Sequence, residues 1–406
     1  MNWSDSMTAT LMALGLSGLS WIYLLAFRGR FWRCDQRLAV SSKASLPQWP
    51  SVCAIVPARN EADMLTHSLP GLLNQKYPGN FRVLLVDDQS TDGTAEVARQ
   101  SAHPSQTEAS LEIMTTAPLP KGWSGKLWAV HQGIEQVLQD TRQPLPDYFL
   151  LTDADILHGQ TTLKDLAIKA EQEHLDLVSL MVLLRCQSFW EKLLIPAFVF
   201  FFQKLYPFPW VNQPRHPMAA AAGGCILVRR EVLMGVGGIE VIRKALIDDC
   251  ALGAAIKGAN SDQGGTGRIW LGLTTSTVSL RPYPSLQTIW NMVARTAFTQ
   301  LHYSFGLLLV SLLSLVVIYL VPPVSLLLGG IAGHWGVVAI ATLIWSLMTL
   351  AYWPTIRLYR LSPLWAFTLP FIALLYTLMT ADSALRHLQG RGGAWKGRVY
   401  ATDSVK

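Results

Sequence analysis

The stretch FRVLLVDDQS, residues 81–90, contains an apolar run that ends in two aspartates. Two other runs have the same form: SVCAIV (51–56) ends at Pro57, and YFLLT (148–152) precedes Asp153 and Asp155. Short, continuous apolar runs are typical of strands that are buried on both faces of a sheet. Helix-like stretches separate them, at residues 64–74, 93–101 and 127–139. This alternation predicts an α/β fold with a mostly parallel sheet and crossover helices.

Polar side chains gather where the predicted strands end. Ligands of open α/β sheets bind at the carboxyl ends of the strands. The residues at those ends are Arg59, Asn60, Glu61, Asp87, Asp88, Asp153 and Asp155. Carboxylates at a shared edge repel one another unless a cation lies among them, and their oxygens suit Mg²⁺ or Mn²⁺. Each aspartate alone is equally well explained as a turn former or helix cap, but the set together predicts a metal-assisted site.

Glycine-based nucleotide and calcium motifs are excluded. The segment Asp88–Gly93 begins like a calcium-binding EF-hand loop, but the twelfth position is Arg99 instead of the glutamate that such a loop requires. After the first predicted strand the chain reads PARNE (57–61), which is neither GxGxxG nor a P-loop. Charge neutralisation by a metal therefore becomes the expected way to hold a nucleotide.

The composition indicates a membrane protein that carries a water-soluble domain. Of the 406 residues, 50% are hydrophobic and 15% are charged, against about 25% charged in soluble chains. The apolar residues gather in four segments at the two ends of the chain. These are Thr8–Phe27, Gly306–Leu328, Trp335–Trp353 and Leu364–Leu385. Each is close to the length that spans the hydrocarbon core of a bilayer.

Basic residues predict how these segments are oriented. Arginines 28, 30, 33 and 37 follow the first segment and no basic residue precedes it, which predicts an uncleaved anchor whose C-terminal side is cytoplasmic. Three further spans would then place the C-terminal tail outside. That tail carries Arg386, Arg391, Lys396 and Arg398. Either one segment is re-entrant or interfacial, or the tail breaks the charge rule, and both alternatives stay open.

These observations predict four parts of the chain. They are a transmembrane anchor at 1–30, a cytoplasmic domain at 48–300, transmembrane helices at 305–388 and a basic tail at 389–406. The aromatic stretch Leu193–Trp210 is expected to be an interfacial element or, equally, a buried core helix. The net charge of +6 lies beside the apolar segments, so no nucleic-acid partner is expected. The five scattered cysteines predict neither disulfides nor a zinc site.

An ordered series of motifs resembles the family 2 glycosyltransferases, which are inverting enzymes with a GT-A fold. The motifs are VPARNEADML (56–65), LLVDDQSTDGTAEVA (84–98), SGKLWAVHQG (124–133), LLTDADI (150–156), AAGGCILVRREVL (221–233) and LIDDCALGAAI (246–256). The resemblance covers about residues 51–299. The flanking apolar segments and the tail GRGGAWKGRVY (390–400) more narrowly resemble the membrane-bound branch associated with hopene or hopanoid glycosylation.

The resemblance implies a role for each motif residue. Asp88 would contact the base or ribose of a nucleotide-sugar, in a pocket lined by Pro57, Arg59 and Glu61. Lys126 would lie near the diphosphate. Asp153 and Asp155 would form the DxD motif that binds Mg²⁺ or Mn²⁺, with Asp155 as the direct ligand.

A second acidic pair would carry the base. Asp248 and Asp249 stand where the family commonly has Glu-Asp, so this pair is assigned as catalytic, with Asp249 as the general base and Asp248 also capping a helix. The processive members of the family have a QxxRW motif before the C-terminal membrane region. The candidate here, MVART at 292–296, keeps only Arg295, which would still reach the diphosphate. A single transfer is therefore expected instead of chain elongation.

The resemblance thus implies an enzyme of lipid glycosylation in the bacterial inner membrane. Its catalytic domain would face the cytoplasm and transfer a sugar, from a UDP-sugar, to a membrane lipid such as a hopanoid. Association with other lipid-biosynthesis enzymes is one expected partnership. Two alternatives stay open: an acceptor that is a polyprenyl phosphate, and a non-catalytic membrane protein that binds nucleotide-sugar. A transporter is disfavoured because no ionisable residue is central to the C-terminal apolar segments.

Overall fold

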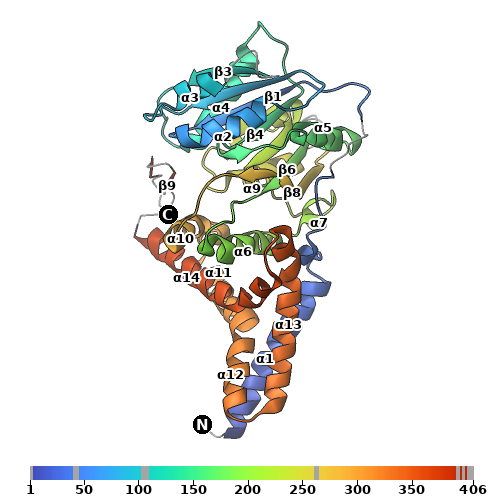
Figure 1. The fold of residues 1–406 in the computed structure, drawn as a ribbon, viewed down its shortest axis with the longest axis vertical. Helices are drawn as coiled ribbons and strands as arrows, with labels where there is room; N and C mark the ends of the chain where they lie inside the picture. The colour runs from blue at the N-terminus through green and yellow to red at the C-terminus, as the bar shows by residue number, and fades with distance from the viewer. Residues whose placement is uncertain are drawn as a thin grey trace.

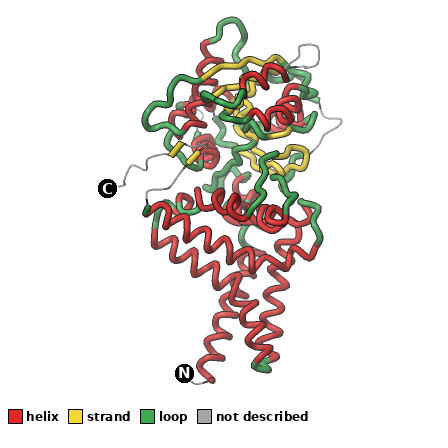
Figure 2. Tube along the Cα trace, turned by 60° about the vertical axis from the view of Figure 1, so that its left-hand side comes forward, coloured by secondary structure: helices red, strands yellow, loops and turns green. Residues whose placement is uncertain are grey.

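The computed structural model describes residues 3–39, 45–101, 109–259 and 265–389, together with 394–395 and 398–399. Most of the predicted basic tail, including Arg391 and Lys396, lies outside these residues. An α/β domain forms one end of the molecule, and a narrow bundle of long helices forms the other (Figure 1). Between them lies a layer of helices that runs across the long axis of the molecule (Figures 1 and 2).

An eight-stranded sheet forms the centre of the α/β domain. Its strands are β1 (Val52–Ala58), β2 (Phe81–Asp87), β3 (Ser110–Thr115), β4 (Tyr148–Thr152), β5 (Ile156–Leu157), β6 (Leu177–Leu183), β7 (Cys225–Arg229) and β8 (Ile269–Ser279). They lie in the order β3-β2-β1-β4-β7-β6-β8-β5. The first four in this order are parallel, whereas β7 is antiparallel to both neighbours and β5 is antiparallel to β8. Two further short strands, β9 (Ala394–Trp395) and β10 (Arg398–Val399), pair with each other.

Crossover helices cover this sheet. They are α2 (Ala62–Leu73), α3 (Thr94–Ser101), α4 (Gly125–Gln139), α5 (Thr162–Gln172), α8 (Arg230–Gly235) and α9 (Asp248–Lys257), with a 3₁₀ turn η2 (Gly238–Ile242) before α9. Every residue of β1 and β4 is buried, which is why these strands read as unbroken apolar runs instead of alternating ones. The sheet therefore separates two apolar layers.

The layer beneath the domain consists of two amphipathic helices and their neighbours. Helix α6 (Phe189–Leu205) begins with a capping box, in which Ser188 accepts a hydrogen bond from the Glu191 amide. The stretch predicted as interfacial or buried therefore forms most of α6 and the short helix α7 (Phe208–Val211). Helix α10 (Leu286–Thr296) and the turn η4 (Thr299–Leu301) lie in the same layer. Tyr376, from a C-terminal helix, donates a hydrogen bond to the Leu194 carbonyl and so ties α6 to the helices below.

Four helical segments in the described part of the chain are long and apolar enough to cross a membrane. The first is α1 (Trp3–Ala26), which is followed by the short turn η1 (Phe31–Arg33). The second combines α11 (Phe305–Leu315), a π-helical turn η5 (Val316–Leu320) and α12 (Val321–Ile331); the third is α13 (Trp335–Leu358). The fourth combines the 3₁₀ turn η6 (Pro363–Thr368) and α14 (Leu369–Leu388). The predicted class, an α/β domain with an N-terminal and several C-terminal candidate membrane helices, is confirmed.

Candidate active site

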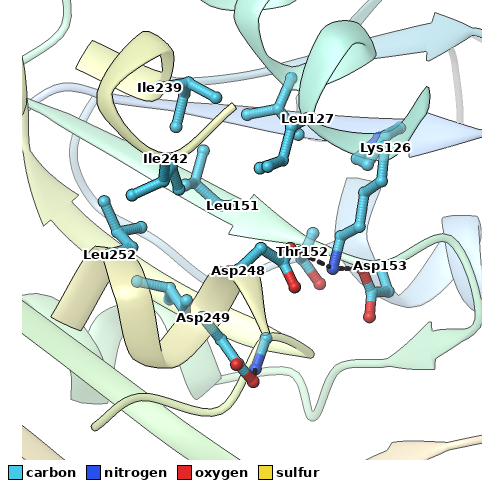
Figure 3. Close-up of a pocket in the computed structure, with 14 residues that line it drawn as sticks. Lys126, Leu127, Leu151, Thr152, Asp153, Ile239, Ile242, Asp248, Asp249 and Leu252 are labelled. Carbon is cyan, nitrogen blue, oxygen red and sulfur yellow. Dashed lines mark hydrogen bonds and ion pairs between the residues drawn. The ribbon is translucent and has the colours of Figure 1, made fainter. Parts of the chain in front are cut away.

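Lys126 lies between two aspartates from different elements. Ser124 caps α4 by accepting a hydrogen bond from the Leu127 amide, and this fixes Lys126 in the first turn. Its Nζ is 2.8 Å from Oδ1 of Asp153, which follows β4, and 3.4 Å from Oδ2 of Asp248, which begins α9. Figure 3 shows the lysine extending from α4 to this position. One ammonium group thus joins the predicted metal-binding motif to the predicted catalytic pair.

The charges of this cluster depend on one another. Burial alone would lower the pKa of Lys126, but the nearby Asp153 and Asp248 carboxylates raise that pKa well above its ordinary value. Lys126 is therefore a permanent cation at neutral pH. Burial raises the pKa of Asp153, and Lys126 opposes this rise. A buried carboxylate is stable only when such a partner compensates for its lost hydration.

Asp249 is held by two backbone amides. Its Oδ2 accepts a hydrogen bond of 2.8 Å from the Gly223 amide, and its Oδ1 accepts one of 2.7 Å from the Cys250 amide. Figure 3 shows its carboxylate turned away from Lys126. Burial, together with the charge of Asp248, raises the pKa of Asp249 to about 6, while Lys126 and the two amides oppose the rise. A carboxylate with a pKa near working pH is suited to general base catalysis.

Gly223 lies where any other residue would crowd the site. A Cβ at this position would lie 3.4 Å from both Asp249 Oδ2 and Lys126 Nζ. This separation is tighter than most Cβ contacts, so a side chain would compress the gap between the lysine and the base. The glycine therefore allows the backbone to approach both groups at once.

Asp155 is engaged by an arginine that lies far away in the sequence. Its Oδ2 accepts hydrogen bonds from Ser279 Oγ at 3.0 Å and from Arg281 Nε at 3.2 Å. The same arginine donates from Nη2 to Glu61 Oε1 at 2.6 Å. Asp155 and Glu61 are both buried, so Arg281 supplies the opposite charge that two predicted site carboxylates need in place of water.

Asp88, predicted to contact the nucleotide, lies buried beside Arg59. It is fully buried, accepts a hydrogen bond from Thr116 Oγ1 at 3.2 Å and lies 3.5 Å from Arg59 Nη1. Arg59 also donates to the Asp88 carbonyl at 2.6 Å. Asp88 therefore holds the arginine in place, and the partly exposed Arg59 is the member of this pair that a ligand can reach.

A small cleft of about 30 Å³ connects several of these groups. Its polar lining comes from Lys126, Thr152, Asp153, Asp248 and Asp249, and its remaining lining is mainly apolar, with Pro57 among the residues. The predicted residues outside this lining are Arg59, Glu61, Asp88, Asp155 and Arg295, and Arg295 differs from the rest because it lies exposed on α10. Helix α9 has Ile247 at its N-cap and no side-chain cap. The expectation that Asp248 caps the helix is therefore wrong, since its carboxylate pairs with Lys126 instead.

The carboxylate oxygens of the site suit a divalent cation whose remaining ligands come from a substrate. The described residues contain no group of three or more His, Cys, Asp or Glu side chains arranged to hold a metal. Asp153 and Asp155 nevertheless supply hard carboxylate oxygens one residue apart. Mg²⁺ is often bound by one or two carboxylates together with substrate phosphates. These two aspartates are therefore the residues that would hold such an ion.

The sequence of the domain matches a known family. Residues 53–237 match the sequence model described as Glycosyl transferase family 2. The matched residues run from β1 to α8. The match includes Asp88, Lys126, Asp153 and Asp155, and ends before Asp248.

Two glycosyltransferases each resemble a short part of the chain, and one solved structure aligns with most of it at low sequence identity. Glycosyltransferase AglE of Haloferax volcanii is 38% identical over 88 residues, which are 21% of this chain and 27% of that protein. The probable glycosyltransferase YdaM of Bacillus subtilis is 26% identical over 139 residues, 31% of each protein. The chain thus spans less than a third of either relative. The solved mannosyltransferase PcManGT from Pyrobaculum calidifontis, in complex with GDP-Man and Mn²⁺, aligns with 94% of this chain and 98% of its own, at 19% identity and a TM-score of 0.49.

Two residues of the candidate site were missed by sequence reasoning. Arg281 lies 126 residues after its partner Asp155, and no motif links the two. Cys250 was overlooked beside the acidic pair, although it supplies an amide to Asp249.

Proposed function

We propose that this protein is an inverting glycosyltransferase that moves a sugar from a nucleotide-sugar, a UDP-sugar by resemblance, to a membrane lipid. The observation that carries the proposal is the separation of two acidic groups by Lys126. Asp153 lies on the side of the lysine toward β4, whereas Asp249 faces away from it with a pKa of about 6. An inverting transfer needs this division, because base and leaving group act on opposite faces of the sugar.

The proposed reaction transfers one proton, forms one bond and breaks another. Asp249 takes the proton of the acceptor hydroxyl as its oxygen bonds to the anomeric carbon. The bond between that carbon and the diphosphate oxygen breaks, and the nucleoside diphosphate leaves with the electron pair. Lys126, a permanent cation, stabilises the negative charge of the departing diphosphate. A Mg²⁺ or Mn²⁺ ion held by Asp153 and Asp155 would supply further neutralisation of this charge.

The nucleotide is proposed to bind along the ends of β1 and β2. Arg59 is the reachable cation there, and Asp88 holds it from behind. Pro57 and Glu61 form the neighbouring wall, with Glu61 fixed by Arg281. Arg295, exposed on α10, is proposed to contact the diphosphate, as the resemblance implies.

A hopanoid is the acceptor that the sequence resemblance favours. A membrane lipid of some kind fits the architecture, since α6 and α10 lie between α9, which begins with the catalytic pair, and the helices α1, α12 and α13 (Figure 1). A polyprenyl phosphate is the second candidate within this class. The non-catalytic alternative is disfavoured by Asp249, because a sensor has no need for a base that is held by two amides.

We further infer that the catalytic domain faces the cytoplasm of a bacterial inner membrane and that the segment 363–388 is re-entrant. Its beginning lies beside α6, where the rings of Trp365 and Phe189 are 5.8 Å apart. Its end lies beside α10, where Trp290 donates to Asp382 at 2.6 Å and Arg386 donates to Asn291 at 2.9 Å. Both ends thus contact the layer beneath the catalytic domain.

The start of this segment lies beside the middle of α13. Trp345, near the middle of α13, donates a hydrogen bond to the carbonyl of Phe367, the fifth residue of the segment, at 3.2 Å. Tyr376, at the middle of the segment, donates a hydrogen bond to the Leu194 carbonyl of α6, so the segment is back beside the layer well before its end. Three full spans would remain, formed by α1, α11–α12 and α13. This arrangement puts the basic C-terminal tail on the cytoplasmic side with the arginines that follow α1, and so removes the conflict in the charge pattern.

The activity is tested with the full-length protein purified in detergent. Release of UDP from a panel of radiolabelled UDP-sugars would be measured with and without a bacterial lipid extract, and with and without Mg²⁺ or Mn²⁺. Label that enters the organic phase only with metal supports the proposal. Measurable UDP binding without turnover of any donor would favour the non-catalytic alternative.

The membrane arrangement is tested by labelling single cysteines in intact and permeabilised cells, in a variant without the native cysteines. Cysteines placed at Gly333, between α12 and α13, and at Gln389, after α14, are compared. We expect the first to react with an impermeant maleimide in intact cells and the second only after the inner membrane is permeabilised. Reaction of both in intact cells would establish a fourth span.

A further inference from the structure

We propose that Thr152, backed by His158, is a positioning residue for the base, because it holds the glycine turn that binds Asp249. The proposal rests on the glycosyltransferase function above and adds residues that control its base. Thr152 is the last residue of β4 and lines the same cleft as Asp249 (Figure 3). The turn consists of Gly223 and Gly224, directly before β7.

The turn needs support from outside because its own residues have no side chains. Glycine has more conformational freedom to lose on folding than any other residue. Both positions nevertheless require glycine. A Cβ at Gly224 would lie 3.2 Å from Val182 and 3.3 Å from Ile156, and one at Gly223 would lie 3.4 Å from the Asp249 carboxylate. The position of the turn must therefore come from hydrogen bonds to its backbone.

Two buried hydroxyl groups hold the turn at its two ends. Thr152 Oγ1 donates a hydrogen bond of 2.8 Å to the Gly224 carbonyl, to which the Asp153 amide donates a longer one of 3.4 Å. Before the turn, Ser179 Oγ accepts a bond of 2.8 Å from the Ala222 amide and donates one of 3.0 Å to the Ala222 carbonyl. Both hydroxyl side chains are buried, where a lost hydrogen bond is not replaced by one to solvent.

The proton positions in this network follow from the partners. A carbonyl oxygen only accepts hydrogen bonds, so the single proton of the Thr152 hydroxyl points to Gly224. His158 Nε2, 2.9 Å from the same hydroxyl, must then carry a proton and donate to it. Burial lowers the pKa of His158 to about 4, so the ring is neutral near pH 7 and its one N–H serves this bond. His158 therefore fixes the direction of the Thr152 hydroxyl.

The turn supplies one of the two amides that bind the base. The Gly223 amide donates to Asp249 Oδ2 at 2.8 Å, whereas the second amide, that of Cys250, belongs to the same helix as Asp249. Of these two amides, the one from outside α9 is that of Gly223. A shift of the turn would leave the carboxylate with its local donor alone. Thr152 thus acts on Asp249 through the backbone of two adjacent glycines.

Four substitutions and a matched control test the proposal in the full-length protein. Thr152→Val keeps the shape of the side chain and removes the hydroxyl, whereas Thr152→Ser keeps the hydroxyl. The control is Thr162→Val, which removes a buried hydroxyl on α5 that is bonded to Thr277 at 3.0 Å. His158→Leu removes the donor behind Thr152, and His158→Gln retains an N–H near the position of Nε2. Melting temperature, UDP-sugar binding, and the pH dependence of kcat for transfer to a bacterial lipid extract are measured for each protein.

We expect Thr152→Val to bind the UDP-sugar as the wild type does and to lose about tenfold in kcat, since a small misplacement of a reacting group slows the reaction strongly. The Gly223 amide lowers the pKa of Asp249, so weakening this bond should raise that pKa and move the acidic limb of the pH profile to higher pH. Thr152→Ser, His158→Gln and the Thr162→Val control should keep the wild-type kcat and pH midpoint. His158→Leu should lie between Thr152→Val and the wild type.

Two results would overturn the proposal and leave the glycosyltransferase function intact. One is a pH midpoint in Thr152→Val that stays at the wild-type value, whatever its kcat. The other is a loss of UDP-sugar binding equal to the loss of transfer, which would assign Thr152 to donor binding beside Asp153. If the melting temperature shows that Thr152→Val does not fold, His158→Leu and His158→Gln decide by the same criteria. Absence of both UDP-sugar binding and turnover in the wild type would instead overturn the proposed function itself.

Discussion

The two halves of the candidate site are built in different ways. The half around Asp153 and Lys126 is formed by strand ends and the helix that follows β3, all within the residues that match the family 2 model. The half around Asp249 is formed by the start of α9 and by the backbone of Gly223, and α9 lies beyond the matched residues. Under the proposed function, donor recognition and acceptor recognition would therefore vary separately.

The largest effect should come from the base itself. Asp249→Asn keeps the shape and removes the charge, so transfer should fall by roughly 10²- to 10⁴-fold while nucleotide-sugar binding stays nearly intact. Steady-state transfer and equilibrium binding of the UDP-sugar would be compared in the same preparation. If transfer and UDP-sugar binding fall equally, Asp249 belongs to the donor half and the division of the site into two halves is wrong.

Lys126 joins the halves, so its loss should affect both. Lys126→Gln leaves Asp153 and Asp248 without their cation, and kcat/KM for the donor should fall by about 100-fold, as for loss of one electrostatic contact to the transition state. Because Lys126 lowers the pKa of Asp249, the acidic limb of the pH profile should also move to higher pH. If kcat/KM for the donor falls while the pH profile of transfer stays the same, Lys126 acts on the donor half alone and does not influence the ionisation of Asp249.

Substitution of Asp155 should change only the dependence of nucleotide binding on the metal ion. Asp155→Ala removes one of the two proposed ligands, so nucleotide binding should lose its dependence on Mg²⁺ or Mn²⁺ while metal-independent binding remains. Mn²⁺ titration in the presence of UDP, followed by electron paramagnetic resonance, measures this directly. Unchanged metal dependence would mean that Asp155 serves only to pair with Arg281.

The smallest expected effect is on the pH dependence of transfer. Asp249 has its pKa raised to about 6 by burial and by Asp248, and it must be ionised to act as the base. Transfer should therefore fall by about tenfold for each pH unit well below this value. Asp248→Asn removes one of the negative charges that raise the pKa, so the midpoint should move to lower pH. A midpoint that does not respond to Asp248→Asn would assign the ionisation to another group.

Local patterns predicted the strands and helices closely. The helix expected at 127–139 is α4 (Gly125–Gln139), and it begins earlier because the Ser124 side chain caps it. The strands expected at 51–56, 81–86 and 148–152 became β1, β2 and β4. Strand β3 was not predicted, and all of its residues are partly or fully exposed, so its apolar pattern is weak.

The sequence by itself determined the α/β fold, the apolar segments and the clustering of acidic residues at strand ends, because these follow from short-range periodicity and from the geometry of parallel sheets. The tertiary structure decided which charges meet. Arg281 pairs with Asp155, which is 126 residues away in the sequence, and Gln300 pairs with Tyr206, which is 94 residues away. Lys126 pairs with Asp248 from a different element. Such pairs depend on how distant elements pack, and no local pattern of residue types encodes that packing. Pairing of this kind also decided that Asp248 faces a lysine instead of capping its helix.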